Sequence, residues 1–464
     1  DNNTAVGNDA LFSNTTGDQN TAVGSGALDA NTTGRRNSAF GYGALGSSTT
    51  ADLNTAIGRA CMLDNTTGAN NTAVGDAALA NNTTASDNTA VGKSALLENT
   101  TGANNTAVGY DALSSNTTNS HNTAVGYQAL QLNNAQYNTA CGKEAAKSNT
   151  SGTRLVAVGN RALYSNTTGT HNHAFGDHAL FACTTGSYNV AVGYEALHDL
   201  TTGAKQVALG AFALANQTTT TTGSVAIGYQ ALVNSNGGDG YSYNTAVGTQ
   251  AMYSLTSGRA NSCLGDGALY SVTNSERNTA VGQGAGGFIN TGDDNLMLGY
   301  NSGKSSSPSG QITTGSGNVC LGDNSINNLF CADTSISSSD ARDKTDVTDF
   351  TKGLDWIKAL RPVTYRWDRR TWYGTDEEPY GTPDGSKKRA RLHVGFLAQE
   401  ALAVEQANGY ATSNDDSLIL NLTEDGMSYG MKYERLVPVL VNAIKELSTK
   451  NDALEARIAT LEGS

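Results

Sequence analysis

Charge, tryptophan and proline are scarce in the first 338 residues of this 464-residue chain. Residues 1–338 carry 12 Lys and Arg and 21 Asp and Glu, whereas residues 339–464 carry 17 and 21. All three Trp and four of the five Pro also lie in the second part. Two physical regimes therefore meet near residue 339, and the chain is not one uniform domain.

Clustered basic residues and long apolar runs are also missing. The net charge is −13, and the one short basic run, residues 387–391, is interpreted as a solvated loop. Binding to nucleic acid or anionic lipid needs Lys and Arg clusters, and a membrane helix needs about 20 apolar residues. We therefore expect no nucleic-acid partner and no membrane insertion.

Metal-ligand spacing is absent as well, because the six cysteines form no CxxC pair. Several replace a small apolar residue of the repeat described next. Buried free thiols are the favoured interpretation, with a disulfide or a metal site as the alternative, and we expect no metal and no cofactor. The cysteines are Cys61, Cys141, Cys183, Cys263, Cys320 and Cys331.

A short periodic motif dominates what is present. Asn-Thr-Ala-Val-Gly at residues 3–7 recurs in 19 exact or variant copies, at a step of 17 residues for most of the length. The step becomes irregular after Gly210, with insertions at residues 218–222 and 236–243. The repeat glycines are 7, 24, 41, 58, 75, 92, 109, 126, 142, 159, 176, 193, 210, 228, 248, 265, 282, 299 and 322.

The chemistry of the repeat opposes helix and favours stacked strands. Gly, Thr and Val disfavour helix, Asn-Thr-Ala-Val-Gly is a short extended segment, and Asn-Thr-Thr-Gly is a turn. We predict a mainly β fold for residues 1–331, a parallel β-roll or solenoid with one strand per coil. Val6 and its equivalents would form one apolar row, Leu11 and its equivalents another, and the Asn at each strand start an amide ladder. Nineteen coils would span roughly 90 Å.

Two rows of Ala, Val and Leu are a thin core for such a length. Assembly of three chains would supply the missing burial and cover exposed sheet edges. The repeat resembles the head repeats of trimeric autotransporter adhesins, in which three chains pack their Val/Ile rows on a central axis. This resemblance implies a homotrimer, although those repeats are a few residues shorter than 17.

Four ordered motifs in the second part resemble the intramolecular chaperone domain of phage tail spikes and endosialidases, the S74 peptidase family. The resemblance covers residues 339–464, a small α+β domain, with residues 332–338 as a linker that contains the cleavage site. The motifs lie at residues 337–344, 360–367, 393–400 and 433–436.

The resemblance implies that Ser339 is a nucleophile and Lys344 its general base. It also implies autoproteolysis of the Ser338–Ser339 bond by this dyad, once and in cis. A serine hydroxyl needs a base, and a lysine acts as one only when burial or a neighbouring cation lowers its pKa. Burial of Lys344 in the assembled trimer would provide such a trigger.

Three further residues complete the predicted site. Arg342 is the candidate cation beside the lysine, although it could equally pair with Asp340, and His393 is a weaker candidate for the neighbourhood of the dyad. The alternative for the serine motif is a plain helix cap. Asp343 replaces a residue that is often apolar in the family, and residues 374–391 form an insertion.

The chain ends in a predicted coiled coil at about residues 439–461. Its apolar residues step by 4 and 3, with Asn451 at one position of the seam, which would fix register. Ile and Leu at these positions favour two strands, whereas the resemblance implies three. A three-stranded coiled coil would have the same symmetry as the trimeric repeats, and we favour it for this reason. The alternative is a single amphipathic helix that packs on its own domain. The seam is Leu440, Ile444, Leu447, Asn451, Leu454, Ile458 and Leu461.

These features predict a trimeric structural and receptor-binding fibre whose C-terminal domain directs assembly and is then released. The partners are two further copies of the chain and a host cell-surface receptor, contacted at the irregular coils. The location is a virion tail fibre or the cell surface, since a bacterial adhesin of the same architecture is the main alternative. An ice-binding array of Thr pairs is a further alternative. The chain begins inside a repeat without Met, and we interpret it as a fragment or processed product.

Overall fold

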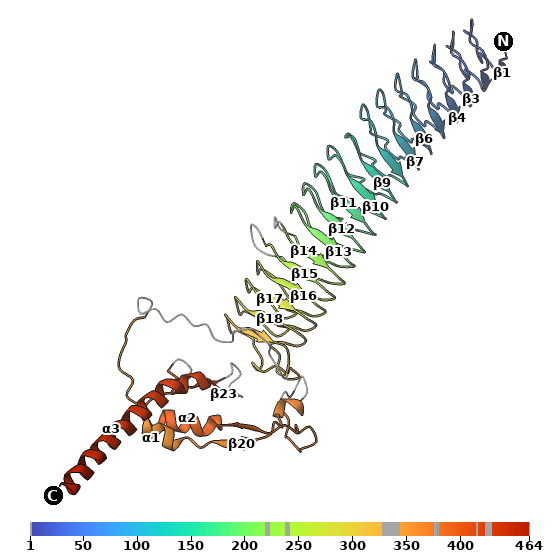
Figure 1. Cartoon of the computed structure of the whole chain (residues 1–464). Coiled ribbons are helices and arrows are strands. Elements are labelled where there is room, and N and C mark those ends of the chain that lie inside the picture. The colour runs from blue at the N-terminus through green and yellow to red at the C-terminus, as the bar shows by residue number, and fades with distance from the viewer. Residues whose placement is uncertain are drawn as a thin grey trace. The chain divides into compact units, whose positions relative to one another are not determined.

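The computed structural model describes residues 2–218, 223–236, 242–326, 344–374, 378, 380–413, 416–422 and 429–463 (Figure 1). The chain folds as two compact units. The first contains residues 1–296 and 316–318, and the second contains residues 297–315 and 319–464.

Nineteen short strands form one parallel sheet, one strand per coil, as the repeat predicts. From β1 to β17 each strand pairs with the next in the same register, so that Thr4 lies opposite Thr21 and Val6 opposite Val23. The mainly β solenoid is thereby confirmed. The strands are β1 (Thr4–Val6), β2 (Thr21–Val23), β3 (Ser38–Phe40), β4 (Thr55–Ile57), β5 (Thr72–Val74), β6 (Thr89–Val91), β7 (Thr106–Val108), β8 (Thr123–Val125), β9 (Thr139–Cys141), β10 (Val156–Val158), β11 (His173–Phe175), β12 (Val190–Val192), β13 (Val207–Leu209), β14 (Val225–Ile227), β15 (Thr245–Val247), β16 (Ser262–Leu264), β17 (Thr279–Val281), β18 (Leu296–Leu298) and β19 (Val319–Leu321).

The interior of a coil is narrow, as the coil of residues 105–121 illustrates. Its strand centre, Ala107, is fully buried, and so are Ala112 and Leu113 from the turn that follows. The predicted Leu row therefore fills the interior. The predicted Val row does not, because the third strand residue points away from the coil and Ala takes the inner place.

The Asn before most strands forms the predicted amide ladder, and Leu155, Gln206 and Ser224 replace it in three coils. The side-chain oxygen of Asn20 accepts the backbone N–H of Asn37 at 2.9 Å, and the Asn37 amide donates to the carbonyl of Ala51 at 2.7 Å. Asn54 continues the ladder in the next coil. These buried amides satisfy polar backbone groups that the thin apolar interior cannot, and they tie each coil to its neighbours.

The described residues of the second unit form three α-helices and four short strands after the last coils, in agreement with the predicted α+β domain. The strands pair as two antiparallel hairpins, β20 with β21 and β22 with β23. Its small core joins Leu360, Ala401, Ile419, Leu420 and Leu436. The elements are α1 (Leu354–Ala359), β20 (Val363–Tyr365), η2 (Arg370–Trp372), β21 (His393–Gly395), α2 (Ala398–Gln406), β22 (Leu420–Leu422), β23 (Tyr429–Met431), η3 (Tyr433–Arg435) and α3 (Leu436–Glu462).

Five of the cysteines lie in the described part of the chain, and all five are free thiols. Four are buried inside coils, and burial raises the pKa of Cys61, Cys183 and Cys263 to about 12. Cys141 departs from the expectation because it occupies the outward third position of β9 and is exposed. Cys331 lies outside the described residues.

Candidate functional site

Most of the predicted cleavage site lies outside the described residues, which resume at Lys344. Ser338, Ser339, Asp340 and Arg342 belong to that stretch, so their proximity to Lys344 stays a prediction. Lys344 itself is exposed in the single chain, at the start of the segment that leads to α1. Burial of this amine would have to come from assembly.

His393 sits on a hairpin that ends in an aromatic cluster. It pairs with Tyr365 across β20 and β21, and the two rings stack with centroids 5.6 Å apart. The edge of Trp367 contacts the same imidazole ring, with centroids 6.3 Å apart. Next to the hairpin, the hydroxyl of Tyr433 accepts the backbone N–H of Phe396 at 3.2 Å. Packing thus fixes the orientation of His393, whereas its predicted place near the dyad stays untested.

The basic run at residues 387–391 is largely exposed and has no helix or strand, as expected of a solvated loop, and two of its cations also lie over aromatic rings. The ammonium of Lys387 lies 5.1 Å from the ring centre of Tyr373, and the guanidinium of Arg389 lies 5.0 Å from that of Trp372. Another guanidinium, that of Arg369, lies 4.3 Å from the ring of Trp367. Cations over aromatic faces attract the negative ring quadrupole, so this run stabilises the inserted segment.

One buried carboxylate has no signal in the sequence. Glu405 of α2 is fully buried, and its oxygens accept the hydroxyl of Ser417 and the backbone N–H groups of Leu418 and Ile419. A carboxylate satisfied by three donors in this way holds the loop before β22 against α2. We assign it a structural role.

Helix α3 has two distinct apolar faces. Leu436, Val439 and Ala443 are buried against the helix's own domain, where Asn442 also donates to the carbonyl of Phe350 at 2.6 Å. The predicted seam lies on another face and is exposed in the single chain, from 43% at Leu440 to 69% at Leu461. The helix therefore packs on its own domain and also presents an apolar stripe.

The outer face of the long sheet carries a second exposed apolar row. All 19 strands have Val, Ile, Leu, Phe or Cys at the third position. In the single chain their exposure reaches 57% at Val6 and 40% at Phe40, and it is still 37% at Val125. A regular apolar row of this length is a candidate association surface.

The Thr pairs contribute to the coil turns. The hydroxyl of Thr15 donates to the carbonyl of Thr32 in the next coil at 2.8 Å, and the same bond repeats along six consecutive coils. One of the two hydroxyl rows is thus bound to backbone. This favours a turn-stabilising role over an ice-binding array.

The described residues contain no group of three or more His, Cys, Asp and Glu side chains placed to hold a metal ion. Within the same residues, no helix combines the length and the apolar character that a membrane span requires.

The chain thus consists of a long parallel β-solenoid followed by a small α+β domain that ends in a long helix. Residues 339–410 match the S74 peptidase family model, described as the chaperone of endosialidase. The chain therefore carries an endosialidase-chaperone domain in its C-terminal part, and this domain together with the solenoid is consistent with a tail-fibre or tailspike-like protein. No curated protein matches the chain significantly.

Proposed function

We propose that this chain forms a homotrimeric fibre whose C-terminal domain directs assembly and then cuts itself off. One observation carries the proposal: an endosialidase-chaperone domain follows a solenoid whose long sheet exposes an unbroken apolar row. Three such rows on a common axis would remove the apolar surface from water, as would three α3 seams.

The chaperone solves a register problem. Neighbouring coils are nearly identical, so two chains displaced by one 17-residue coil would still match most of their ladders. A C-terminal trimer that forms first aligns the three chains before the coils associate. Once the chaperone domain is removed, unfolded chains can no longer realign and refold. The fibre then persists because it unfolds slowly, so its stability is kinetic.

The proposed cut uses Ser339 and Lys344. The neutral amine of Lys344 takes the hydroxyl proton while the oxygen of Ser339 attacks the carbonyl carbon of Ser338. The proton then passes to the departing amine of Ser339, and water hydrolyses the resulting ester. The family match begins at Ser339 itself, which supports this position for the new N-terminus.

The solenoid would serve as the receptor-binding part, on a virion or at a cell surface. The predicted insertions lie partly outside the described residues, at 219–222 and 237–241, so they stay candidates for receptor contact.

A bacterial surface adhesin is the second candidate function, because an apolar row on the strands is what the resemblance to adhesin head repeats implies. Light scattering for the trimer mass, with intact-mass measurement for a released 126-residue fragment, tests the proposal; an uncut monomer would reject it.

Cys141 offers an internal test of the trimer axis. It replaces Val in the outer row, so three chains packed through that row bring three Cys141 thiols together. Mild oxidation should join two of them and leave the third, so that a non-reducing denaturing gel shows dimer and monomer in equal molar amounts. The other described cysteines are buried and will not compete.

Two variants control this experiment. Cys141→Val restores the usual residue of the row and should abolish the dimer band while the trimer mass is kept. Cys331→Ser removes the cysteine outside the described residues and should leave the dimer band intact. If Cys141 of the native fibre reacts with maleimide as fast as in denatured protein, the row does not face a shared axis.

A charge in the α3 seam should block assembly. Leu454→Lys places an ammonium in the exposed stripe beyond the part of the helix that contacts its own domain, so the domain should fold while the helices fail to associate. We expect loss of the trimer peak in light scattering and at least tenfold less released fragment. Ala456→Lys adds the same charge on the opposite side of the helix and should assemble normally. A Leu454→Lys trimer of unchanged yield would contradict the seam.

A further inference from the structure

Six consecutive coils end in an aromatic or a cationic residue. The order His, Tyr, cation occurs twice in succession, which no other part of the repeat shows. These residues, which we name the closing column, are His121, Tyr137, Arg154, His171, Tyr188 and Lys205.

The column is built into the ladder of the coils. The backbone N–H of Tyr188 donates to the carbonyl of Thr170 in the preceding coil at 3.0 Å, and that of Lys205 donates to Ser187 at 3.1 Å. The rings of His121 and Tyr137 stack with centroids 5.3 Å apart and planes 2° from parallel, and those of His171 and Tyr188 lie 4.7 Å apart. The side chains are thus pre-ordered in one line, spaced by about 4.8 Å per coil.

The closing column shares its backbone conformation with the rest of the repeat. Tyr137 and Tyr188 have φ of +63° and +62°, and the same left-handed conformation occurs at this place in other coils, for example at Leu53, Asn70 and Arg277. What distinguishes the closing column is therefore its run of aromatic and basic residues. The two tyrosines remain 49% and 56% exposed, so their rings are available to a ligand.

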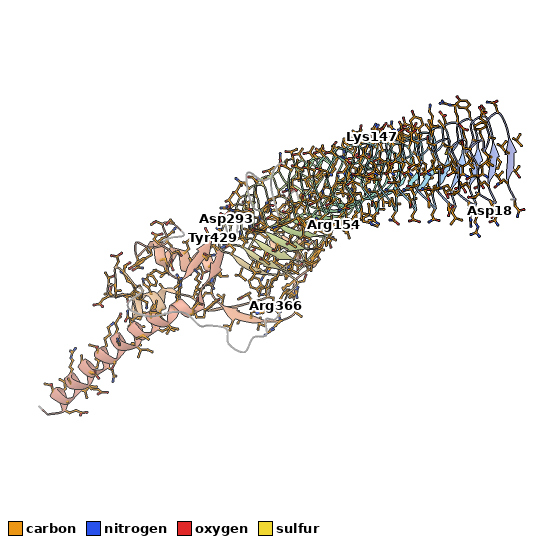
Figure 2. All side chains as sticks on the ribbon, turned by 90° about the horizontal axis from the view of Figure 1, so that it is seen from above. Asp18, Lys147, Arg154, Asp293, Arg366 and Tyr429 are labelled. Atoms are coloured by element: carbon orange, nitrogen blue, oxygen red, sulfur yellow. The ribbon has the colours of Figure 1, made fainter. Side chains whose placement is uncertain are left out.

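Between residues 105 and 206 the acidic side chains keep to one long edge of the solenoid, which also carries basic residues such as Lys147 and Arg161. Figure 2 shows Arg154 along one edge, the edge of Asp18, and Lys147 along the other. Between residues 105 and 206 the acidic residues lie in the turn after each strand, on the Lys147 side, where Glu144 binds Lys147 at 3.2 Å and Arg161 at 2.7 Å. They are Asp111, Glu144, Asp177, Glu195 and Asp199. The closing column is therefore acid-free, in a chain of net charge −13.

We propose that the closing column binds an extended acidic polysaccharide laid along the solenoid edge. The offset ring pairs leave part of each face uncovered, and the electropositive C–H face of a sugar packs against such a negative face. Arg154 and Lys205 pair with carboxylates or sulfates of the glycan. The column is roughly 24 Å long at the coil spacing, enough for several sugar units in a line. The proposal rests on the receptor-binding role of the fibre and names the class of its ligand.

The experiment measures binding of hexasaccharides to the intact fibre by calorimetry at low salt. The acidic probes are oligogalacturonate, oligoguluronate, hyaluronan and heparin, and the neutral controls are cellohexaose and maltohexaose. We expect at least one acidic probe to bind and neither neutral control to do so. Tyr137→Ala/Tyr188→Ala should weaken binding at least tenfold, and Arg154→Gln/Lys205→Gln should weaken it and flatten its salt dependence.

Matched variants carry the same changes elsewhere on the solenoid. Tyr110 and Tyr127 stack at 5.4 Å after their strands, and Tyr110→Ala/Tyr127→Ala should leave binding unchanged. Lys143→Gln is the matching control for charge. The proposal is rejected if no acidic probe binds more tightly than the neutral sugars, or if the control variants weaken binding as much as the column variants. It is also rejected if a dT12 oligonucleotide binds and loses affinity in the same column variants. Trimer mass and fragment release are measured on every variant, so failure of the fibre itself is seen separately.

Discussion

Ser339→Ala should yield a full-length trimer that assembles and is never cut. The serine contributes only to the cleavage step, so its loss should lower the rate of release by at least about 10³-fold while the chaperone still aligns the three chains. A denaturing gel should show the intact 464-residue chain alone, and light scattering should show a trimer. Normal processing of this variant would reject Ser339 as the nucleophile.

Two companion variants separate the roles of the neighbouring groups. Lys344→Arg keeps the positive charge but removes the proton acceptor, because a guanidinium stays protonated in proteins, and it should also remain uncut. Ser338→Ala makes the same atomic change as Ser339→Ala on the other side of the bond and should be cut normally. If Lys344→Arg is processed at the wild-type rate, the base must be another group.

The uncut fibre also tests why the template is discarded. With the chaperone still attached, heated and cooled Ser339→Ala should recover its trimer, whereas the processed fibre should not refold after complete unfolding. The comparison uses refolding yield and unfolding rate, since stability in the proposed scheme is kinetic. Equal refolding of the two forms would remove the reason for cleavage.

The period of the repeat predicts the strands, their parallel register and the amide ladder, because stacking demands the same residue type at the same place in every coil. It does not by itself assign the faces of a three-residue strand such as Thr106–Val108. The decisive signal was the size of the middle residue. Ala or Cys fills every strand centre but one, because in most coils the Leu of the following turn already occupies the narrow interior. The exception is Met297, whose sulfur lies beside Gly303 at the place where other coils have Leu.

Long-range pairings in the C-terminal domain have no such signal. The heptad steps of α3 predict the apolar stripe that the single chain exposes, whereas its role as a coiled-coil seam stays a prediction. Leu436, Val439 and Ala443 on a second face are recognisable only once the rest of the domain is in place. The same holds for Arg389 over Trp372, which are 17 residues apart with no regular element to relate them. The proposed catalytic serine rests on family resemblance, since a short polar motif alone fits a helix cap equally well.

Gly109→Ala should break the solenoid at one defined coil. Gly109 has φ of +138°, a conformation that L residues rarely adopt, and a Cβ on it would lie 2.3 Å from the carbonyl oxygen of Gly126 in the next coil. The atom that the added Cβ would overlap belongs to the backbone, so a change of side-chain rotamer can relieve neither the strain nor the overlap. We expect a loss of about 3–5 kcal/mol per chain in the free energy of unfolding.

Because each coil contacts only its neighbours, the damage should stay near residues 109 and 126. Limited proteolysis should cut Gly109→Ala between these coils, at a site that is resistant in the wild type, and circular dichroism should show a lower melting temperature. Gly267→Ala is the matched control: its φ is +59° and no atom lies within 4 Å of the added Cβ, so strain remains without overlap. Other coils place Asp111 or Glu144 at this position with a similar φ, and the control should cost less than about 1 kcal/mol. Equal melting of the two variants would mean that overlap with the next coil is not what requires glycine after each strand.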